Sequence, residues 1–416
     1  MIETSYDTAR LKFLGEIIPG NSPPSSTYNK DGDGVPFIQG SGEFGDEVPI
    51  PKKYCTEPSK IAQPSDYLIS MRAPVGELNR ADQQIGLGRG VAAFRANNSI
   101  LSNQYAWYAL QATIHQLERV SMGSTFKAIT ASQLGSLVIP LPPTDKQQEI
   151  VAFLDHHIFN IDRSIKKKQH LYDLVEEKYQ AVIEERFTLG LNAKEDFGTA
   201  SWTVHLPDKW SLSRGKGLFR EVDKRSIDGT ETLFSLRKDE GLIPHNEVSD
   251  KDIPPSDLVG YKKVKAGQLV MNRMRAATGL VGVAPSDGIV SPDYAIFQTT
   301  ELADPHFYQM LFQTELFKTL FRSRSNGLGT GSAGFLRLYT DDFLALWFPH
   351  PPIEVQKRII TDVSSQLERM NELLEATKQS IQLLQERRNV LIKTTVSGKI
   401  NVSDWEPPGE KEEAAV

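Results

Sequence analysis

Two long amphipathic helices, each introduced by the same proline pattern, are the feature that most constrains how this chain can fold. Pro140-Leu-Pro-Pro143 stands before the first helix and Pro349-His-Pro-Pro352 before the second. Identical residues then follow at matching positions, for example Gln147 in the first copy and Gln356 in the second. A repeat that spans a whole helix indicates two structural halves within one polypeptide.

Both helices space their apolar residues alternately by three and four positions, which is the pattern of a coiled-coil seam. The predicted seam positions are Ile150, Leu154, Ile158, Ile161, Ile165, Val175, Val363, Leu367, Met370, Leu374, Ile381, Leu384 and Leu391. Such a stripe can also pack on the helix's own globular domain, so that alternative stands beside helix pairing. Thr144 and Gln147 fit a capping box at the start of the first helix, and Gly190 and Gly398 suit helix ends.

The repeat divides the 416 residues into segments. We predict a globular domain over residues 1–143, a helix over 144–192, a second globular domain over 193–352, a second helix over 353–401 and a disordered acidic tail over 402–416. The expected fold class is α+β. It comprises two pseudo-symmetric mixed α/β domains separated by two long helices that form an antiparallel coiled coil.

Within the globular segments, short apolar runs bounded by turn residues predict strands in the same order twice. The predicted strands are Val35–Ile38, Tyr67–Met71, Val91–Phe94 and Leu137–Pro140, and then Thr232–Leu236, Leu269–Met271, Tyr294–Phe297 and Leu344–Phe348. Each domain also contains one predicted helix. The first spans Asn103–Leu117 after the cap Ser102, and the second begins at Pro305 after the cap Asp304.

Composition narrows the classes of function. The net charge is −6 and no segment is basic overall, so any surface for nucleic acid must be local. A single cysteine excludes an internal disulfide, and no signal peptide or membrane-length apolar run appears. We therefore expect a cytoplasmic protein without membrane contact.

Motifs for catalysis are missing from the sequence. It contains no phosphate-binding loop, no dinucleotide fingerprint and no Asn-Pro-Pro-Tyr segment of the amino-methyltransferase type. The adjacent His156 and His157 point to different sides of a helix, so they cannot form a metal pair. We expect neither a catalytic site nor a metal site in this chain.

In its doubled arrangement the chain resembles the specificity subunit of a type I restriction-modification enzyme. The resemblance rests on Gly123-Ser-Thr-Phe-Lys-Ala-Ile129, Leu137-Val-Ile-Pro-Leu-Pro-Pro143 and Gln147-Gln-Glu-Ile150, and in the second half on Leu206-Pro-Asp-Lys-Trp210, Gly331-Ser-Ala-Gly334, Leu346-Trp-Phe-Pro-His-Pro-Pro352 and Gln356-Lys-Arg-Ile359. It covers nearly all of the chain before the acidic tail. The first domain departs from it by opening with Arg10-Leu-Lys-Phe-Leu-Gly15 rather than a Leu-Pro-x-x-Trp segment.

The resemblance implies a non-catalytic DNA-recognition subunit with two target-recognition domains. Each domain would read one half of a split, asymmetric site on double-stranded DNA, and the two helices would fix the gap. Two adenine-specific methyltransferase subunits and the restriction/translocase subunits would assemble on it. S-adenosylmethionine, ATP and Mg²⁺ are expected on those partner subunits, and no cofactor is expected on this chain.

Polar and cationic residues in the presumed loops are the candidates for contact with DNA bases and phosphates. The candidates are Gln39, Ser41, Arg72, Arg89, Ser124, Thr125 and Lys127 in the first domain, and Arg237, Lys238, Asn272, Arg273, Arg275, Arg322, Arg324 and Arg337 in the second. For any single arginine, a solvated surface charge is the alternative. For the whole chain, the alternatives are a stand-alone DNA-binding regulator with two half-site readers, and a coiled-coil adaptor without a nucleic-acid role.

Overall fold

The computed structural model describes residues 4–117, 128–188, 209–238, 240–250, 253–328 and 335–407. Its contacts group the chain into two compact units, each with one globular domain and parts of both long helices. Unit 1 consists of Met1–Gln169 and Lys378–Val416, and unit 2 of His170–Thr377. This grouping cuts through both helices, and the predicted boundaries at residues 143, 192, 352 and 401 stay predictions.

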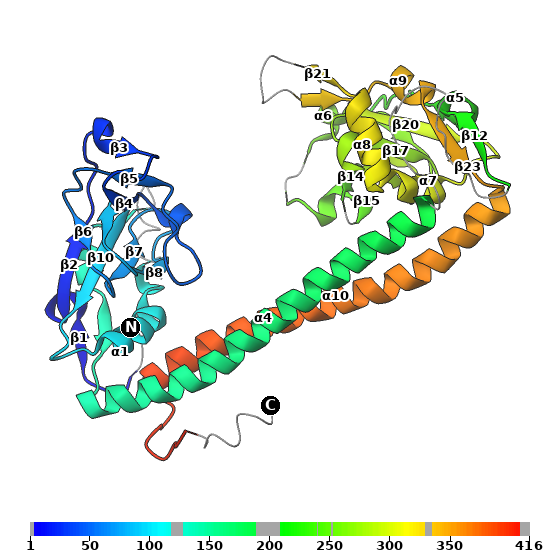
Figure 1. The fold of residues 1–416 in the computed structure, drawn as a ribbon. Helices are drawn as coiled ribbons and strands as arrows, with labels where there is room; N and C mark the ends of the chain where they lie inside the picture. Colours follow the sequence, from blue (N-terminus) through cyan, green and yellow to red (C-terminus); the bar gives the residue numbers. More distant parts are fainter. Residues whose placement is uncertain are drawn as a thin grey trace. The chain divides into compact units, whose positions relative to one another are not determined.

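Both predicted long helices are present, as α4 (Thr144–Thr188) and α10 (Ile353–Val396) (Figure 1). After α10, Gly398 has a φ of 75°, the left-handed conformation predicted for a helix end. Residues 189–208, which include Gly190, lie outside the described residues.

The predicted seam is the buried stripe of each helix. The buried positions are Ile150, Leu154, Ile158, Ile161, Val363 and Leu367. The half-buried positions are Ile165, Val175, Met370, Leu374, Ile381, Leu384 and Leu391. Leucines off the stripe, such as Leu174 and Leu383, are exposed. The heptad reading therefore identifies the inward face of both helices correctly.

In each unit the stripe packs on the globular domain and on the other long helix together. In unit 1, Lys146 near the start of α4 donates a hydrogen bond to the Ser403 hydroxyl just beyond the end of α10. Further along α4, Asp162 accepts a hydrogen bond of 2.9 Å from Arg388, which lies earlier in α10. The paired positions run in opposite directions along the two helices, which makes the pair antiparallel. In unit 2, α4 joins the first turns of α10 in one apolar cluster with the domain.

Unit 1 contains two main sheets and a short strand pair. An antiparallel sheet of order β2-β10-β7-β8 consists of β2 (Gly15–Pro19), β10 (Val91–Ala96), β7 (Tyr67–Ser70) and β8 (Leu78–Arg80). A second sheet of order β3-β5-β4-β9-β6 consists of β3 (Tyr28–Asn29), β5 (Lys53–Cys55), β4 (Val35–Ile38), β9 (Ile85–Leu87) and β6 (Ile61–Ala62). The pair is β1 (Thr8–Arg10) with β11 (Val138–Pro140). The α-helices in the described part of this domain are α1 (Asn103–Thr113) and α3 (Ala131–Gly135).

Unit 2 repeats the antiparallel sheet in the order β13-β20-β17-β18, formed by β13 (Phe219–Glu221), β20 (Tyr294–Thr299), β17 (Leu269–Asn272) and β18 (Val281–Val283). It also repeats the short pair, as β12 (Ser211–Arg214) with β23 (Trp347–His350). Further pairs are β14 (Phe234–Arg237) with β15 (Gly241–Pro244), β16 (Lys262–Val264) with β19 (Gly288–Val290), and β21 (Asn326–Leu328) with β22 (Phe335–Arg337). The helices are α5 (Gly215–Leu218), α6 (Pro255–Leu258), α7 (Pro305–Phe312), α8 (Glu315–Arg324) and α9 (Thr340–Ala345).

A buried glutamine fixes the start of α4 against the domain of unit 1. The Gln147 side chain is fully buried, and its oxygen accepts a hydrogen bond of 2.8 Å from the Ser102 amide. Its nitrogen donates to the carbonyls of Ile100 and Pro142, both at 3.0 Å. The capping box predicted with Thr144 is therefore wrong. Gln147 uses its side chain to hold the start of α1 beside the start of α4.

Gln356 repeats this arrangement at the start of α10. It is also fully buried, it accepts from the Asp304 amide at 2.8 Å, and it donates to the carbonyls of Leu302 and Pro351, both at 2.8 Å. The copied glutamine thus joins a helix start to a proline carbonyl in both halves. This shared contact gives a physical reason for the repetition in the sequence.

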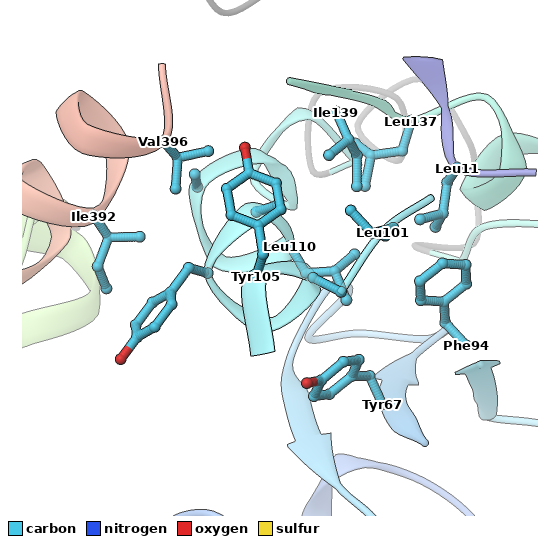
Figure 2. Packing of buried hydrophobic residues seen from close by; sticks show 14 of the residues in the cluster. Leu11, Tyr67, Phe94, Leu101, Tyr105, Leu110, Leu137, Ile139, Ile392 and Val396 are labelled. Carbon is cyan, nitrogen blue, oxygen red and sulfur yellow. The ribbon is translucent and has the colours of Figure 1, made fainter. Parts of the chain in front are cut away.

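The core of unit 1 joins α1, the four-stranded sheet and the last turns of α10. Figure 2 shows Tyr105 of α1 between Leu137 and Ile139 on one side and Ile392 and Val396 of α10 on the other. Ser102 caps α1 as predicted, because its side chain accepts from the Tyr105 amide. In unit 2, Asp304 likewise caps α7 by accepting from the amides of its first turn.

Two structural predictions need correction. Leu344 lies in α9 rather than in a strand, and β23 begins only at Trp347, because this apolar run first completes a helix. The predicted disordered tail begins too early: Val402 is buried, and the Trp405 ring lies 5.4 Å from that of Phe153 on α4. Val402 and Trp405 therefore pack in the core of unit 1, and residues 408–416 lie outside the described part.

Candidate nucleic-acid interface

In unit 2, a cavity of about 690 Å³ opens between the β14–β15 hairpin and the segment that follows β17. It is lined by Ser235, Leu236, Arg237, Lys238, Glu240, Arg275, Thr278, Leu280 and Tyr294. Gly241 opens β15 directly after the hairpin turn, and its φ of 72° suits glycine. On the other side, the Asn272 side chain accepts from the Met274 amide at 3.0 Å and turns the chain out of β17 toward Arg275.

Three of the predicted DNA-binding residues meet at this cavity: Arg237, Lys238 and Arg275. All three side chains are exposed, and none of them forms an ion pair or a side-chain hydrogen bond with another described residue. Among the described residues of the lining, Glu240 is the one carboxylate. The cavity is thus a local positive surface on a chain of net charge −6. The composition requires such a local surface if the chain binds nucleic acid.

Tyr294 forms part of the cavity wall between the cationic residues. Burial raises the pKa of its phenol above the ordinary value, while the charges of Arg275 and Arg237 and a hydrogen bond with Asn272 oppose this rise. Tyr294, Arg237 and Arg275 line the same cavity. An anion in the cavity would interact with two cations at once.

Arg273 and Arg337, also predicted to bind DNA, instead make contacts within the domain. Arg273 donates to the carbonyl of Asp293 at 2.8 Å and to that of Pro292 at 3.3 Å. Arg337 forms an ion pair of 3.5 Å with the Asp293 carboxylate. Burial, and then the charge of Arg337, lower the pKa of Arg273. These two arginines hold the turn before β20 rather than offering free charge.

The other candidates of unit 2 lie outside the cavity lining. Asn272 supports the turn beside it. Arg322 and Arg324 are in the last turn of α8, where cationic side chains favour the negative end of the helix dipole. Their predicted contact with DNA stays a prediction.

In unit 1, four candidates come together where strands end. The Gly88 amide donates to the Ile38 carbonyl, and the Met71 amide donates to the Gly90 carbonyl, both at 2.8 Å. The loop with Gln39 and Ser41 after β4, Arg72 after β7, and Arg89 before β10 therefore lie near one another. A side chain at Gly90 would stand 2.2 Å from the Gln39 carbonyl oxygen, so this close approach requires glycine.

Arg72 and Arg89 are exposed and form no ion pair in the described part of unit 1. The Gln39 side chain accepts from Lys53 at 3.4 Å, and the Glu43 carboxylate holds the loop by accepting from the Gln39 amide at 2.7 Å. Ser124, Thr125 and Lys127 fall outside the described residues.

Sequence reasoning missed several residues of the unit 2 cavity, namely Ser235, Glu240, Thr278 and Tyr294. Tyr294 could have been noticed, because it opens a predicted strand directly after Pro292 and Asp293. Over the described ranges, no three His, Cys, Asp or Glu side chains gather in a way that could hold a metal ion. No helix of that same part combines the length and apolar character needed to cross a bilayer.

Comparisons with known proteins support the resemblance predicted from the sequence. Residues 4–171 match the family model of the type I restriction modification DNA specificity domain. The repeated antiparallel sheet indicates a second domain of related plan in unit 2. The chain is therefore similar to the specificity subunits of type I restriction-modification systems, and that prediction is confirmed.

Individual relatives agree with this. A putative type I restriction enzyme MjaX specificity subunit of Methanocaldococcus jannaschii is 45% identical over 135 residues, which are 32% of this chain and 32% of the relative. The match thus spans about a third of that relative's length. The type I restriction enzyme EcoBI specificity subunit of Escherichia coli is 21% identical over 392 residues, 87% of this chain and 79% of the relative.

A solved structure shows the same fold. It is a chain from a study of complex assembly and conformational transition of the type I R-M system. The likeness covers 96% of this chain and 100% of the other, with a TM-score of 0.69 and 14% identity. The predicted α+β class, with two similar domains and long helices, is confirmed.

Proposed function

We propose that this chain is the sequence-specific DNA-recognition subunit of a type I restriction-modification complex. The observation that carries the proposal is the convergence of free cations at one cavity of unit 2, in a chain whose first 171 residues contain the match to the DNA specificity domain. Arg72 and Arg89 give unit 1 a comparable surface at its strand ends. Two domains with one plan and different surface residues suit two different half-sites.

The partners and cofactors form part of this proposal. Two adenine-specific methyltransferase subunits and the restriction/translocase subunits would assemble on the chain, and they would carry S-adenosylmethionine, ATP and Mg²⁺. This chain would contribute recognition and scaffolding without catalysis of its own. The differing side chains of the two domains support an asymmetric DNA site read in two parts.

Gel-shift titration of double-stranded DNA with and without the methyltransferase tests the proposal. The DNA would carry the motif that the complex methylates, and a shuffled duplex would measure non-specific binding. We expect specific binding by the complex, weaker binding by the double variant Arg237→Gln/Arg275→Gln, and near-normal binding by Arg220→Gln, which removes an exposed arginine outside the cavity lining. Tight specific binding by the chain alone would instead favour a stand-alone regulator, and the absence of any DNA binding would favour an adaptor.

A further inference from the structure

The shape of the unit 2 cavity restricts which part of a DNA duplex it can receive. Side chains that read bases must project into a groove, because the base edges form the groove floor. The free cations Arg237, Lys238 and Arg275 instead surround a hollow of about 690 Å³. A hollow accepts a group that protrudes from its ligand, and the protruding groups of duplex DNA are its phosphates.

The hydrogen-bonding groups of the cavity fit the same ligand. Ser235 already shares a hydrogen bond of 2.9 Å with His245, and the Thr278 hydroxyl donates to the Arg275 carbonyl at 2.8 Å. The lining then offers the three cationic donors and, as its described acceptor group, the carboxylate of Glu240. An arginine can also donate to the N7 and O6 acceptors of guanine, so donor chemistry alone fits both ligands, and the hollow shape of the lining is what favours the phosphate.

The neighbouring arginines show which cations are available. Arg273 is occupied by backbone carbonyls and Arg337 by Asp293. Lys262, although buried, lies 3.4 Å from Asp223 and 3.7 Å from Glu221. Arg237, Lys238 and Arg275 thus stand out from these paired cations, and the pKa of Tyr294 responds to both cavity arginines.

We propose that this cavity is a phosphate clamp: Arg237, Lys238 and Arg275 bind backbone phosphate of the DNA and position unit 2 without reading sequence. An arginine guanidinium group can donate two parallel hydrogen bonds to two phosphate oxygens, and a lysine ammonium group adds a compact positive charge. The inference rests on the proposed function and assigns this site to affinity rather than specificity. The bases of the second half-site would then be read by other residues of unit 2.

The test is the salt dependence of DNA binding by the assembled complex of this chain with its methyltransferase. Each phosphate contact contributes about 0.9 to the slope of log K against log salt concentration. Arg275→Gln and Arg237→Gln should each reduce the slope by up to about 0.9, and Arg220→Gln should leave it unchanged. The methylated motif, mapped in cells for each variant, should remain that of the parent protein.

Modified DNA separates the two possible sources of the contact. A single methylphosphonate at the contacted position should weaken the parent complex strongly and Arg275→Gln less, since one of the three cationic contacts is already lost in this variant. Substitution of 7-deazaguanine for guanine should weaken both proteins equally. An altered motif in Arg275→Gln, or a 7-deazaguanine effect that vanishes in this variant, would show base reading and overturn the clamp. If the parent complex itself lacks specific DNA binding, the proposed function fails instead.

Discussion

Gln147→Ala should open the junction between α1 and α4. The truncation leaves the Ser102 amide and the carbonyls of Ile100 and Pro142 without their partner, at two part-buried hydrogen bonds and one buried hydrogen bond. An unsatisfied buried group costs about 1–3 kcal/mol. Taking the lower value for each of these groups gives a loss of about 3 kcal/mol in the local free energy of opening.

The neighbouring Gln148 provides a matched control, because it is the same residue type but exposed. Its replacement by alanine should change stability by less than about 0.5 kcal/mol. Amide hydrogen exchange measures local opening directly. In Gln147→Ala, the amides at the start of α1 should exchange roughly a hundredfold faster, because each 1.4 kcal/mol corresponds to a factor of ten.

Gln356→Ala should have a similar effect on the Asp304 amide in unit 2, because that glutamine makes the same three hydrogen bonds. Equal exchange rates in Gln147→Ala and Gln148→Ala would refute the reasoning. So would a large effect at one glutamine and none at the other, because the argument depends on their equivalence.

Three further predictions concern packing, polar contacts and pH. Leu367→Ala, at the buried seam, should lower the free energy of unfolding in urea by about 2–5 kcal/mol. The control Leu383→Ala, at a residue that is 65% exposed, should lower it by less than about 0.5 kcal/mol, and equal losses would contradict the seam. Arg388→Ala removes hydrogen bonds to Asp162 and Gln111 at partly exposed positions, and it should lower the free energy of unfolding by about 1 kcal/mol. A double-mutant cycle of Arg388→Ala with Asp162→Ala should show coupling, whereas the control cycle of Arg387→Ala with Asp162→Ala should show none. Burial lowers the pKa of His350, so the imidazole of the unfolded chain takes up a proton at a higher pH than that of the folded chain. The contribution of neutral His350 to stability is therefore present above about pH 6.5 and is lost as the pH falls toward the pKa of the folded state. Chemical unfolding from pH 7.5 to 5 should therefore show a smaller decline for His350→Gln than for the parent or for the exposed control His306→Gln, and parallel declines would refute this assignment.

Periodic and repeated features were the predictable part of this fold. The seam from Ile150 to Leu391, the caps Ser102 and Asp304 and the strand at Val35–Ile38 all follow from local sequence, because spacing and capping chemistry act over a few residues. Strands of two residues, such as β3 and β6, could not be predicted, because their pairing is decided by distant partners.

The role of each arginine depended on tertiary contacts. Arg273 and Arg275 are two positions apart and equivalent in sequence terms, yet Arg273 is bound by the carbonyls of Pro292 and Asp293 while Arg275 remains free at the cavity. Gln147 looked like part of a capping box and instead reaches a different helix. Local sequence therefore indicated which residue types were present, and the fold decided which of them are available to a ligand.

Mapping methylated adenines across the genome of cells that produce this chain with its methyltransferase tests the central claim most directly. Two independent readers predict a split, asymmetric motif with a fixed gap, and exchange of residues 211–343 for those of a relative should change one half of the motif only. A continuous motif, or a change in both halves after this exchange, would contradict the account.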